Sequence, residues 1–343
     1  MEKEKLRTEC LRLIRCDTMS DCHELIDIYS DFIFKVIINY QMDEVDSNSK
    51  ADAKIVLQMI FTKLLNLKQV TKGIAHTTKD GTLTLKNIVD PTIVACLIRN
   101  AYETISIFNL IYVNTKTDDE RVILYNLWCI SGLKNRQKFE RYTKSLADFE
   151  DEENYTPEQI KISELHKIQI EKNKEKLELE KHQINKYLDQ IKQTNLYKSL
   201  NQEGIRIIDE VIKKKDYKIK FSDGKVVKLI WQDLTNVMQI KEGLMDDIYT
   251  YFSLYSHPSN VSVFQFADLY KVGEEYFAEM TNFQLKNLFM LTSIFIADYI
   301  KLFPNVLETF NRLDIKDQII INYHNTFARG NTFSINNSHL NLD

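Results

Sequence analysis

The stretch PTIVACLIRNAYETISIFNLIYVN, residues 91–114, decides the fold that the sequence predicts. Asp90 and Pro91 form a strong helix start, because a carboxylate caps the first turn and proline needs no N–H at the first helical position. Apolar side chains such as Leu97, Ile105 and Phe108 then cover most of the circumference. We therefore expect a buried helix at the centre of the protein.

A narrow polar stripe interrupts this apolar surface. Thr92, Arg99, Glu103 and Ser106 follow one another at spacings of seven, four and three, which places them on one helix face. Arg99 and Glu103 must find partners or water, since an unpaired buried charge is costly. The stripe marks the expected position of a site.

Composition indicates a helical protein. The 343 residues include only four prolines and eight glycines, while Lys, Glu, Leu and Ile are abundant. We predict a mainly α fold: a multi-helix bundle with a long projecting helical arm and one or two small β-hairpins.

The division into domains follows from changes in composition. The basic run that ends near Lys144 gives way to the acidic segment DFEDEEN, residues 148–154. We expect four regions: a helical bundle formed by 1–150 and 232–327 that carries the polar site, a charged helical arm over 155–200, a basic β-hairpin over 205–231, and a loose tail over 328–343.

The arm has half of a coiled-coil seam. Ile170, Leu177, Ile184 and Ile191 recur every seven residues, but polar residues such as Lys174 occupy the alternate positions. This pattern predicts a helix that packs one narrow edge on a neighbouring helix. It also suggests a homodimer or a protein partner bound through residues 157–200.

The segment YKIKFSDGKVVKLIW, residues 217–231, predicts a hairpin that turns at Asp223–Gly224. Its lysines either protect a strand edge from aggregation or contact RNA phosphates, and both interpretations follow from the same charges. The net charge of −4 leaves nucleic-acid binding to such local patches. The candidate nucleic-acid-binding residues are Lys213, Lys214, Lys215, Lys218, Lys220, Lys225 and Lys228.

The sequence predicts no metal site and no cofactor. Cys10, Cys16 and Cys22 recur every six residues, a spacing that scatters them around a helix, and the five cysteines form no CxxC pair. No GxGxxG, GxxxxGK[ST] or HExxH motif is present. We expect buried thiols in a reducing compartment.

The sequence also predicts no membrane association. Its opening, MEKEKLRTECLR, is charged where a signal peptide needs an apolar segment. Charged residues, among them Asp298 and Lys301, interrupt its longest apolar runs. We therefore expect a soluble, cytoplasmic protein.

A second polar face precedes Pro258. Tyr249, Ser253 and His257 follow at steps of four, so they share one face of a helix. Packed against the Arg99/Glu103 stripe, this face would complete a polar pocket inside the bundle. The same contacts would equally make a structural network without catalysis.

These two helices resemble those of bacterial helical families of the HEPN-like group, which occur among toxins and phage-defence proteins. The resemblance rests on Leu97-Ile98-Arg99 with Glu103, and on Tyr249, Ser253 and His257-Pro258-Ser259. It implies a helical bundle with a polar site and suggests RNA cleavage. Ribonucleases of this group typically carry a histidine four to six residues after an arginine on one helix, and no arginine here is followed in that way.

Two hypotheses follow. The first is a metal-independent endoribonuclease, in which His257 acts as acid or base, Arg99 holds the phosphate, Glu103 orients one of them, and Ser253 and Tyr249 donate hydrogen bonds. The second is a non-enzymatic sensor or scaffold, in which the cluster fixes the bundle and the arm binds a partner.

Overall fold

The computed structural model describes residues 2–139, 157–272 and 274–338. These residues are mainly helical, and their strands form two separate two-stranded antiparallel sheets. The expected mainly α fold with small hairpins is confirmed.

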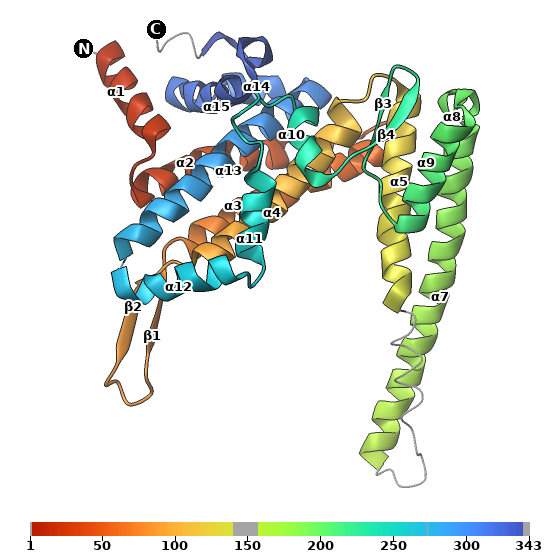
Figure 1. The fold of residues 1–343 in the computed structure, drawn as a ribbon, viewed down its shortest axis with the longest axis horizontal. Coiled ribbons are helices and arrows are strands. Elements are labelled where there is room, and N and C mark those ends of the chain that lie inside the picture. Colours follow the sequence, from red (N-terminus) through yellow and green to blue (C-terminus); the bar gives the residue numbers. More distant parts are fainter. Residues whose placement is uncertain (1, 140–156, 273, 339–343) are drawn as a thin grey trace. The chain divides into compact units, whose positions relative to one another are not determined.

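The chain divides into two compact units (Figure 1). Unit 1 comprises Met1–Asn114 and Ile230–Asp343, and unit 2 comprises Thr115–Leu229. This division differs from the expected one, because the helix that follows residue 117 belongs with the arm and not with the bundle. The expected helix over 118–147 is described only as far as residue 136, and the acidic segment 148–154 lies outside the described residues.

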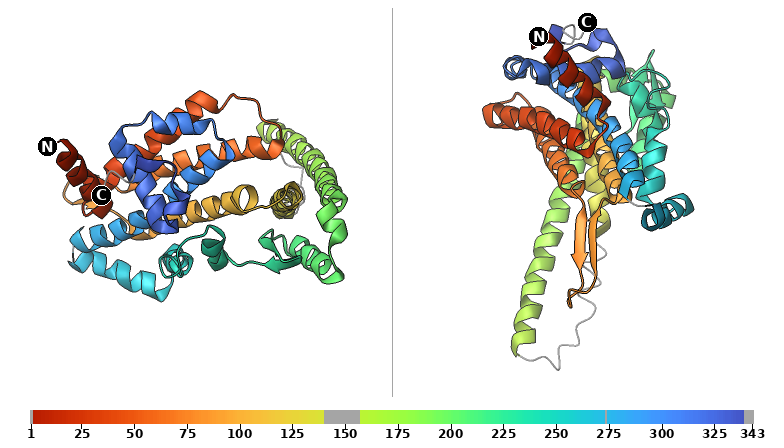
Figure 2. Two further views of the ribbon diagram at one scale, coloured as in Figure 1. Left: turned by 90° about the horizontal axis from the view of Figure 1, so that it is seen from above. Right: turned by 90° about the vertical axis from the view of Figure 1, so that its left-hand side faces the viewer.

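Unit 1 is built mostly from helices. In chain order its elements are α1 (Glu2–Arg15), α2 (Met19–Tyr40), α3 (Asn48–Val70), β1 (Ile74–Thr77), β2 (Thr84–Ile88), α4 (Pro91–Phe108), the π-helical η1 (Asn109–Val113), η4 (Trp231–Asp233), α10 (Leu234–Val237), α11 (Ile248–Ser256), α12 (Asn260–Val272), α13 (Glu274–Leu302), α14 (Val306–Asn311), α15 (Ile315–Arg329) and η5 (Asn331–Phe333). The β1–β2 hairpin projects from these helices, and the right-hand view of Figure 2 shows it edge-on.

Helix α4 is central to unit 1. Asp90 Oδ1 accepts hydrogen bonds from the backbone N–H groups of Thr92 and Ile93, which fixes the start of the helix. The helix packs against α3, α11 and α13, and its side chains Ile98 and Tyr102 are completely buried. Burial of such side chains contributes about 1.5–3 kcal/mol each, so this packing supplies much of the stability of unit 1.

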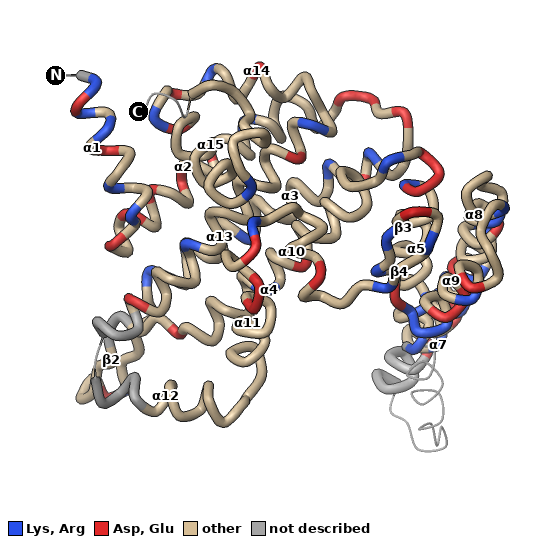
Figure 3. The backbone as a smooth tube through the Cα atoms, turned by 45° about the horizontal axis from the view of Figure 1, so that its top comes forward, with Lys and Arg blue, Asp and Glu red and all other residues tan. Residues whose placement is uncertain are grey.

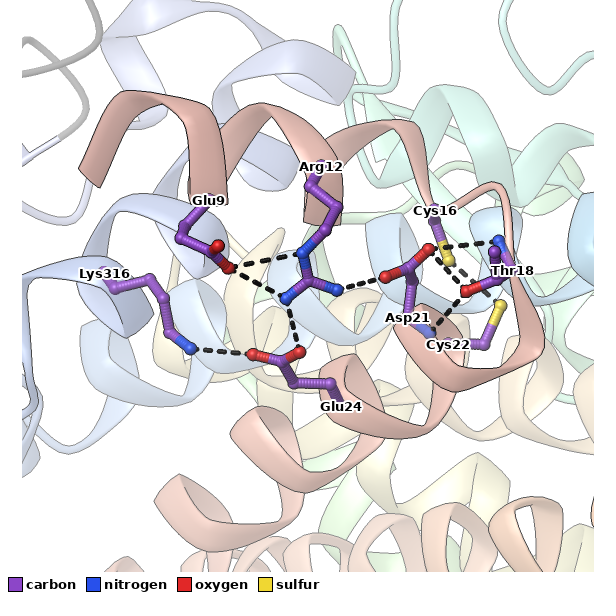
Figure 4. Close-up of polar contacts among 8 residues, drawn as sticks. All are labelled: Glu9, Arg12, Cys16, Thr18, Asp21, Cys22, Glu24 and Lys316. Atoms are coloured by element: carbon purple, nitrogen blue, oxygen red, sulfur yellow. Dashed lines mark hydrogen bonds and ion pairs between the residues drawn. The ribbon is translucent and has the colours of Figure 1, made fainter. Parts of the chain in front are cut away.

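Helix α1 is attached through charged groups (Figure 4). The guanidinium of Arg12 bonds to Glu9 on its own helix and to Asp21 and Glu24 on α2. Lys316 of α15 extends the network by donating to Glu24 at 2.8 Å. Three helices are therefore joined by one set of ion pairs.

The cysteines nearby are buried and free. The Sγ atoms of Cys16 and Cys22 lie 3.0 Å apart, next to the Thr18–Asp21 capping box that begins α2. Cys10 is also fully buried. These three positions agree with the expectation of buried thiols.

The described part of the tail is not loose. The side chain of Asn322 donates to the carbonyl oxygen of Asn336 at 2.6 Å and to Ser334 Oγ at 3.1 Å. Asn325 donates to the carbonyl oxygen of Phe333 at 2.6 Å. Asparagine side chains can replace missing backbone partners, so a segment without apolar periodicity still packs on α15. Residues 339–343 lie outside the described residues.

Unit 2 contains the arm and the lysine-rich hairpin. Its elements are α5 (Asp118–Arg136), η2 (Gln137–Phe139), α7 (Pro157–Gln193), α8 (Asn195–Ser199), α9 (Gln202–Lys214), β3 (Ile219–Ser222) and β4 (Lys225–Lys228). At about 1.5 Å per residue, the 37 residues of α7 extend over roughly 55 Å. Charges of both signs interleave along α7 and α9 (Figure 3).

The seam of α7 is buried against α5. Leu177, Ile184 and Ile191 are 8%, 8% and 1% exposed, while Leu165 and Ile168, nearer the start of the helix, are more than half exposed. The apolar repeat is thus satisfied within the chain over the second half of the helix.

The β3–β4 hairpin turns where the sequence predicts. Asp223 and Gly224 both have positive φ, at 49° and 72°, as a type I′ turn requires. Ile219 pairs with Lys228 and Ser222 with Lys225. Ile219 and Val226 are buried on one face of the hairpin, which Lys228 shares as the cross-strand partner of Ile219. Lys220 and Lys225 lie along the other face.

Candidate functional site

Four of the predicted site residues come together in unit 1. Arg99 and Glu103 lie one turn apart on α4, Tyr249 lies on α11, and His257 is the residue at which α11 ends. Helices α4 and α11 pack against each other, which brings the two polar faces into contact. We call Arg99, Glu103, Tyr249 and His257 the polar cluster.

Arg99 joins the other three members of the cluster. Its Nε donates to Glu103 Oε1 at 3.0 Å, and its Nη2 donates to Tyr249 Oη at 2.7 Å. Its Nη1 lies 3.1 Å from Nε2 of His257. Tyr249 Oη then donates to Glu103 Oε1 at 3.2 Å, which closes the ring of hydrogen bonds.

The contact with Arg99 indicates which nitrogen of His257 accepts a hydrogen bond. A guanidinium only donates hydrogen bonds, so Nε2 of His257 must accept. The imidazole is therefore neutral, and its proton is on Nδ1. A neutral imidazole with an unprotonated Nε2 beside a fixed cation has the protonation state of a general base.

Burial and nearby charges shift the pKa values of Arg99 and Tyr249. Burial lowers the pKa of Arg99, but its hydrogen bond with Tyr249 and the charge of Glu103 outweigh this effect, so the pKa is raised. Burial, supported by the charge of Glu103, raises the pKa of Tyr249 against the opposing effect of Arg99. Tyr249 therefore keeps its proton.

Aromatic rings pack against the guanidinium of Arg99. Arg99 Cζ lies 4.9 Å from the centroid of the Tyr249 ring. That ring stacks on Trp231, with centroids 5.6 Å apart and planes inclined by 16°. Tyr102 lies against Tyr249 and donates to the carbonyl oxygen of Trp231 at 2.7 Å. These contacts fix Arg99 in one orientation.

Access to the cluster differs among its members. The side chains of Arg99 and Glu103 are 22% and 25% exposed, Tyr249 is buried, and His257 is exposed. A ligand would therefore reach His257 first and Arg99 and Glu103 about equally, while Tyr249 contacts the guanidinium from the buried side.

Ser253 does not join the cluster. Its Oγ donates to the carbonyl oxygen of Tyr249 one turn earlier, at 2.8 Å, and makes no hydrogen bond to another cluster member. Serine often bonds the preceding turn of its own helix in this way. Sequence spacing placed the residue on the correct face but could not show where its hydroxyl points.

Two supporting residues were missed from the sequence. In the sequence, Trp231 is the last residue of the segment that predicts a hairpin, and Tyr102 lies within the apolar stretch 91–114. Tyr102 directly precedes Glu103, and an aromatic residue with a buried hydroxyl needs a partner. That requirement was the signal that could have identified it.

Only some of the predicted lysines are unpaired. Lys214 and Lys228 both form ion pairs with Glu210, and Lys218 pairs with Asp216. Within the described residues, no ion pair involves Lys213, Lys220 or Lys225, and all three are exposed. Neighbouring carboxylates thus reduce the positive charge of the hairpin.

Two further findings on the described residues concern metal binding and membrane spans. No group of three His, Cys, Asp or Glu side chains among them lies close enough to hold a metal ion. No helix in the same ranges has the length and apolar character needed to cross a bilayer.

Comparison with known proteins identifies no relative. No model of a protein family matches the chain. Searches of curated proteins and of solved structures likewise find no match.

Proposed function

We propose that the protein is a HEPN-like, metal-independent endoribonuclease that acts as a toxin or an anti-phage effector, with the polar cluster as its active site. The observation that carries the proposal is the contact between Arg99 Nη1 and His257 Nε2 at 3.1 Å. It places a neutral base beside a fixed cation at an exposed edge of unit 1. RNA cleavage needs both groups, because the attacking hydroxyl must lose a proton while charge develops on the phosphate.

The proposed reaction uses the 2′-hydroxyl of RNA as its nucleophile. His257 Nε2 takes the hydroxyl proton, the 2′-oxygen attacks the adjacent phosphorus, and the bond to the 5′-oxygen breaks. The products are a 2′,3′-cyclic phosphate and a 5′-hydroxyl, which receives its proton from the imidazolium or from water. Arg99 stabilises the charge on the phosphate oxygens, and Glu103 and Tyr249 keep Arg99 in position.

Cleavage of RNA in the presence of EDTA tests the proposal. We expect the full chain to produce fragments ending in a 2′,3′-cyclic phosphate, and we expect His257→Ala and Arg99→Ala to abolish cleavage. His76→Ala is the matched control, because His76 is an exposed histidine on β1, and it should cleave like the wild type. Intact RNA after prolonged incubation with folded wild type would refute the proposal.

A second candidate is a non-enzymatic sensor or scaffold that binds a partner through α7. The closed ring of hydrogen bonds around Arg99 favours it, since such a ring is also what a structural brace between α4 and α11 requires. The two candidates differ in the role of His257. A brace predicts that neither His257→Ala nor His76→Ala changes any activity, and that Arg99→Ala acts on stability alone.

Thermal melts of the same variants separate the two. His257 is exposed, so His257→Ala should change the free energy of unfolding by less than about 0.5 kcal/mol. Arg99→Ala removes three hydrogen bonds, of which those to Glu103 and Tyr249 are partly buried, and should cost about 1–2 kcal/mol. A stable His257→Ala protein that has lost cleavage supports the enzyme.

A further inference from the structure

Unit 1 contains a second polar site, away from the cluster around Arg99. A cavity of about 350 Å³ lies between η1, the second half of α13, the end of α15 and the segment that follows it. Its volume falls within the range of sites for small molecules, roughly 300–1,000 Å³. Val113, Ile300 and Ile335 supply apolar parts of its wall.

Two charges at its wall are almost completely buried. Arg329 Nη1 donates to Asp298 Oδ1 at 2.8 Å, and the two side chains are 3% and 4% exposed. Asn109 donates through Nδ2 to the other carboxylate oxygen at 2.7 Å. Asn325 Oδ1 accepts a hydrogen bond from Arg329 Nε at 3.0 Å. The centroid of the Phe333 ring lies 4.6 Å from Arg329 Cζ.

Two polar atoms of this arrangement have no hydrogen-bond partner among the described residues. Asn109 Oδ1 is buried and has no hydrogen-bond partner among the described residues. Arg329 Nη2 makes no hydrogen bond there either, since the other two guanidinium nitrogens take Asp298 and Asn325. An unsatisfied buried acceptor costs about 1–3 kcal/mol, so a site that retains one must gain from it elsewhere.

A second cation faces the same cavity. Lys301 lies one turn after Asp298 on α13, is exposed, and forms no ion pair with a described residue. Asp298 is already occupied by Arg329 and Asn109, so the cavity has one positive charge in excess. The backbone is also unusual here: η1 is a π-helical turn, and Gln239 in the wall has a φ of +60°. Both features are enriched at functional sites.

We propose that this cavity binds a small organic anion, a phosphate monoester or a carboxylate with an apolar body. Its anionic group pairs with Lys301 and Arg329 Nη2, and an N–H or O–H group of the ligand donates to Asn109 Oδ1. The apolar body lies on Val113, Ile300 and Ile335. The proposal is independent of RNA cleavage, because it uses no residue of the polar cluster.

The test is isothermal titration of the full-length protein with 4-hydroxyphenyl phosphate and with 4-hydroxybenzoate, whose hydroxyl group can donate to Asn109 Oδ1, and with phenol as the neutral comparison. We expect both anions to bind and phenol not to bind. Lys301→Gln should weaken binding about ten-fold, the usual effect of losing one charged hydrogen bond. Ala297→Leu should abolish binding, because Ala297 lines the cavity and the larger side chain fills it.

Lys79→Gln is the matched control. It removes one exposed positive charge from the β1–β2 loop and should bind the anions like the wild type. Arg329→Met is not used, since its loss of binding could reflect misfolding. Absence of binding by either anion would overturn the proposal. So would equal weakening by Lys301→Gln and Lys79→Gln, or unchanged binding by Ala297→Leu.

Discussion

Tyr29 Oη lies 2.7 Å from Nδ1 of His324 in the core of unit 1, where both side chains are buried. Burial lowers the pKa of His324 to about 4, so the imidazole is neutral in the folded protein. In the unfolded chain it titrates near 6.5. The folded state thus binds fewer protons between these two values, and stability must fall as the pH drops through that window.

We therefore predict acid sensitivity at mildly acidic pH. Lowering the pH from 6.5 to 5 should reduce the free energy of unfolding by about 1.5 kcal/mol, measured by urea denaturation. Burial also lowers the pKa of His23, which adds to the effect in the same direction. His324→Gln should remove most of the slope and leave the contribution of His23. An unchanged slope in that variant would contradict the assignment.

The Asp298–Arg329 pair should respond unequally to the loss of each partner. Asp298→Ala leaves a guanidinium that cannot lose its proton in a buried site, and we expect a cost of about 3–5 kcal/mol. Arg329→Met should cost less. Burial already raises the pKa of Asp298 against the opposing charge of Arg329, so the remaining carboxyl can become neutral.

The pH dependence of Arg329→Met provides the check. Its folded state takes up a proton that its unfolded state does not, so its deficit relative to wild type should shrink as the pH falls. Chemical denaturation at several pH values measures this difference. A deficit that stays constant, or one larger than that of Asp298→Ala, would argue against a neutral carboxyl.

The seam of α7 predicts a stability difference within unit 2. Ile191→Ala creates a cavity where the side chain is 1% exposed, and it should cost about 2–5 kcal/mol. Ile170→Ala changes the same residue type at a partly exposed position and should cost much less. Hydrogen exchange in α5 and α7 of the full chain should increase in the first variant only. Similar exchange in both variants would mean that the seam contributes evenly to the stability of unit 2 along its length.

The predicted lysines at the end of α9 and along the β3–β4 hairpin include a paired set and an unpaired set. If the hairpin contacts RNA, replacing Lys213, Lys220 and Lys225 with Ser should weaken binding and reduce the salt slope by about 2, because three contacts with single-stranded phosphates are lost. Replacing Lys214, Lys218 and Lys228 should change the slope less, since carboxylates already neutralise them. Filter binding over a salt series measures both. Two equal slopes, or increased light scattering without lost affinity, would favour edge protection.

Features set by local chemistry could be predicted from the sequence. The capped start of α4, the turn at Asp223–Gly224 and the helical character all follow from short stretches of chain. The meeting of Arg99 with Tyr249 and His257 was also predictable, because residue spacing defined one polar face on each of two helices. Whether that meeting performs chemistry stays a prediction.

Features set by tertiary packing could not be predicted. Asn109 and Asp298 are 189 positions apart, and no spacing links them. In the sequence, Asp298 only interrupts an apolar run. The grouping of α5 with α7 likewise depends on tertiary packing, since α7 comes later in the chain.

The interrupted course of unit 1 has a consequence for its synthesis. Unit 2 is one continuous segment, whereas α4 must wait for α11 and α13, which follow unit 2 in the chain. At roughly 5–20 residues per second, a ribosome needs on the order of ten seconds to translate the inserted segment. During that delay α4 can pack against α3, but the part of its apolar surface that contacts α11 and α13 remains uncovered. The inserted segment can complete its own fold first, and the nascent chain then has a period in which chaperones can bind the waiting helix.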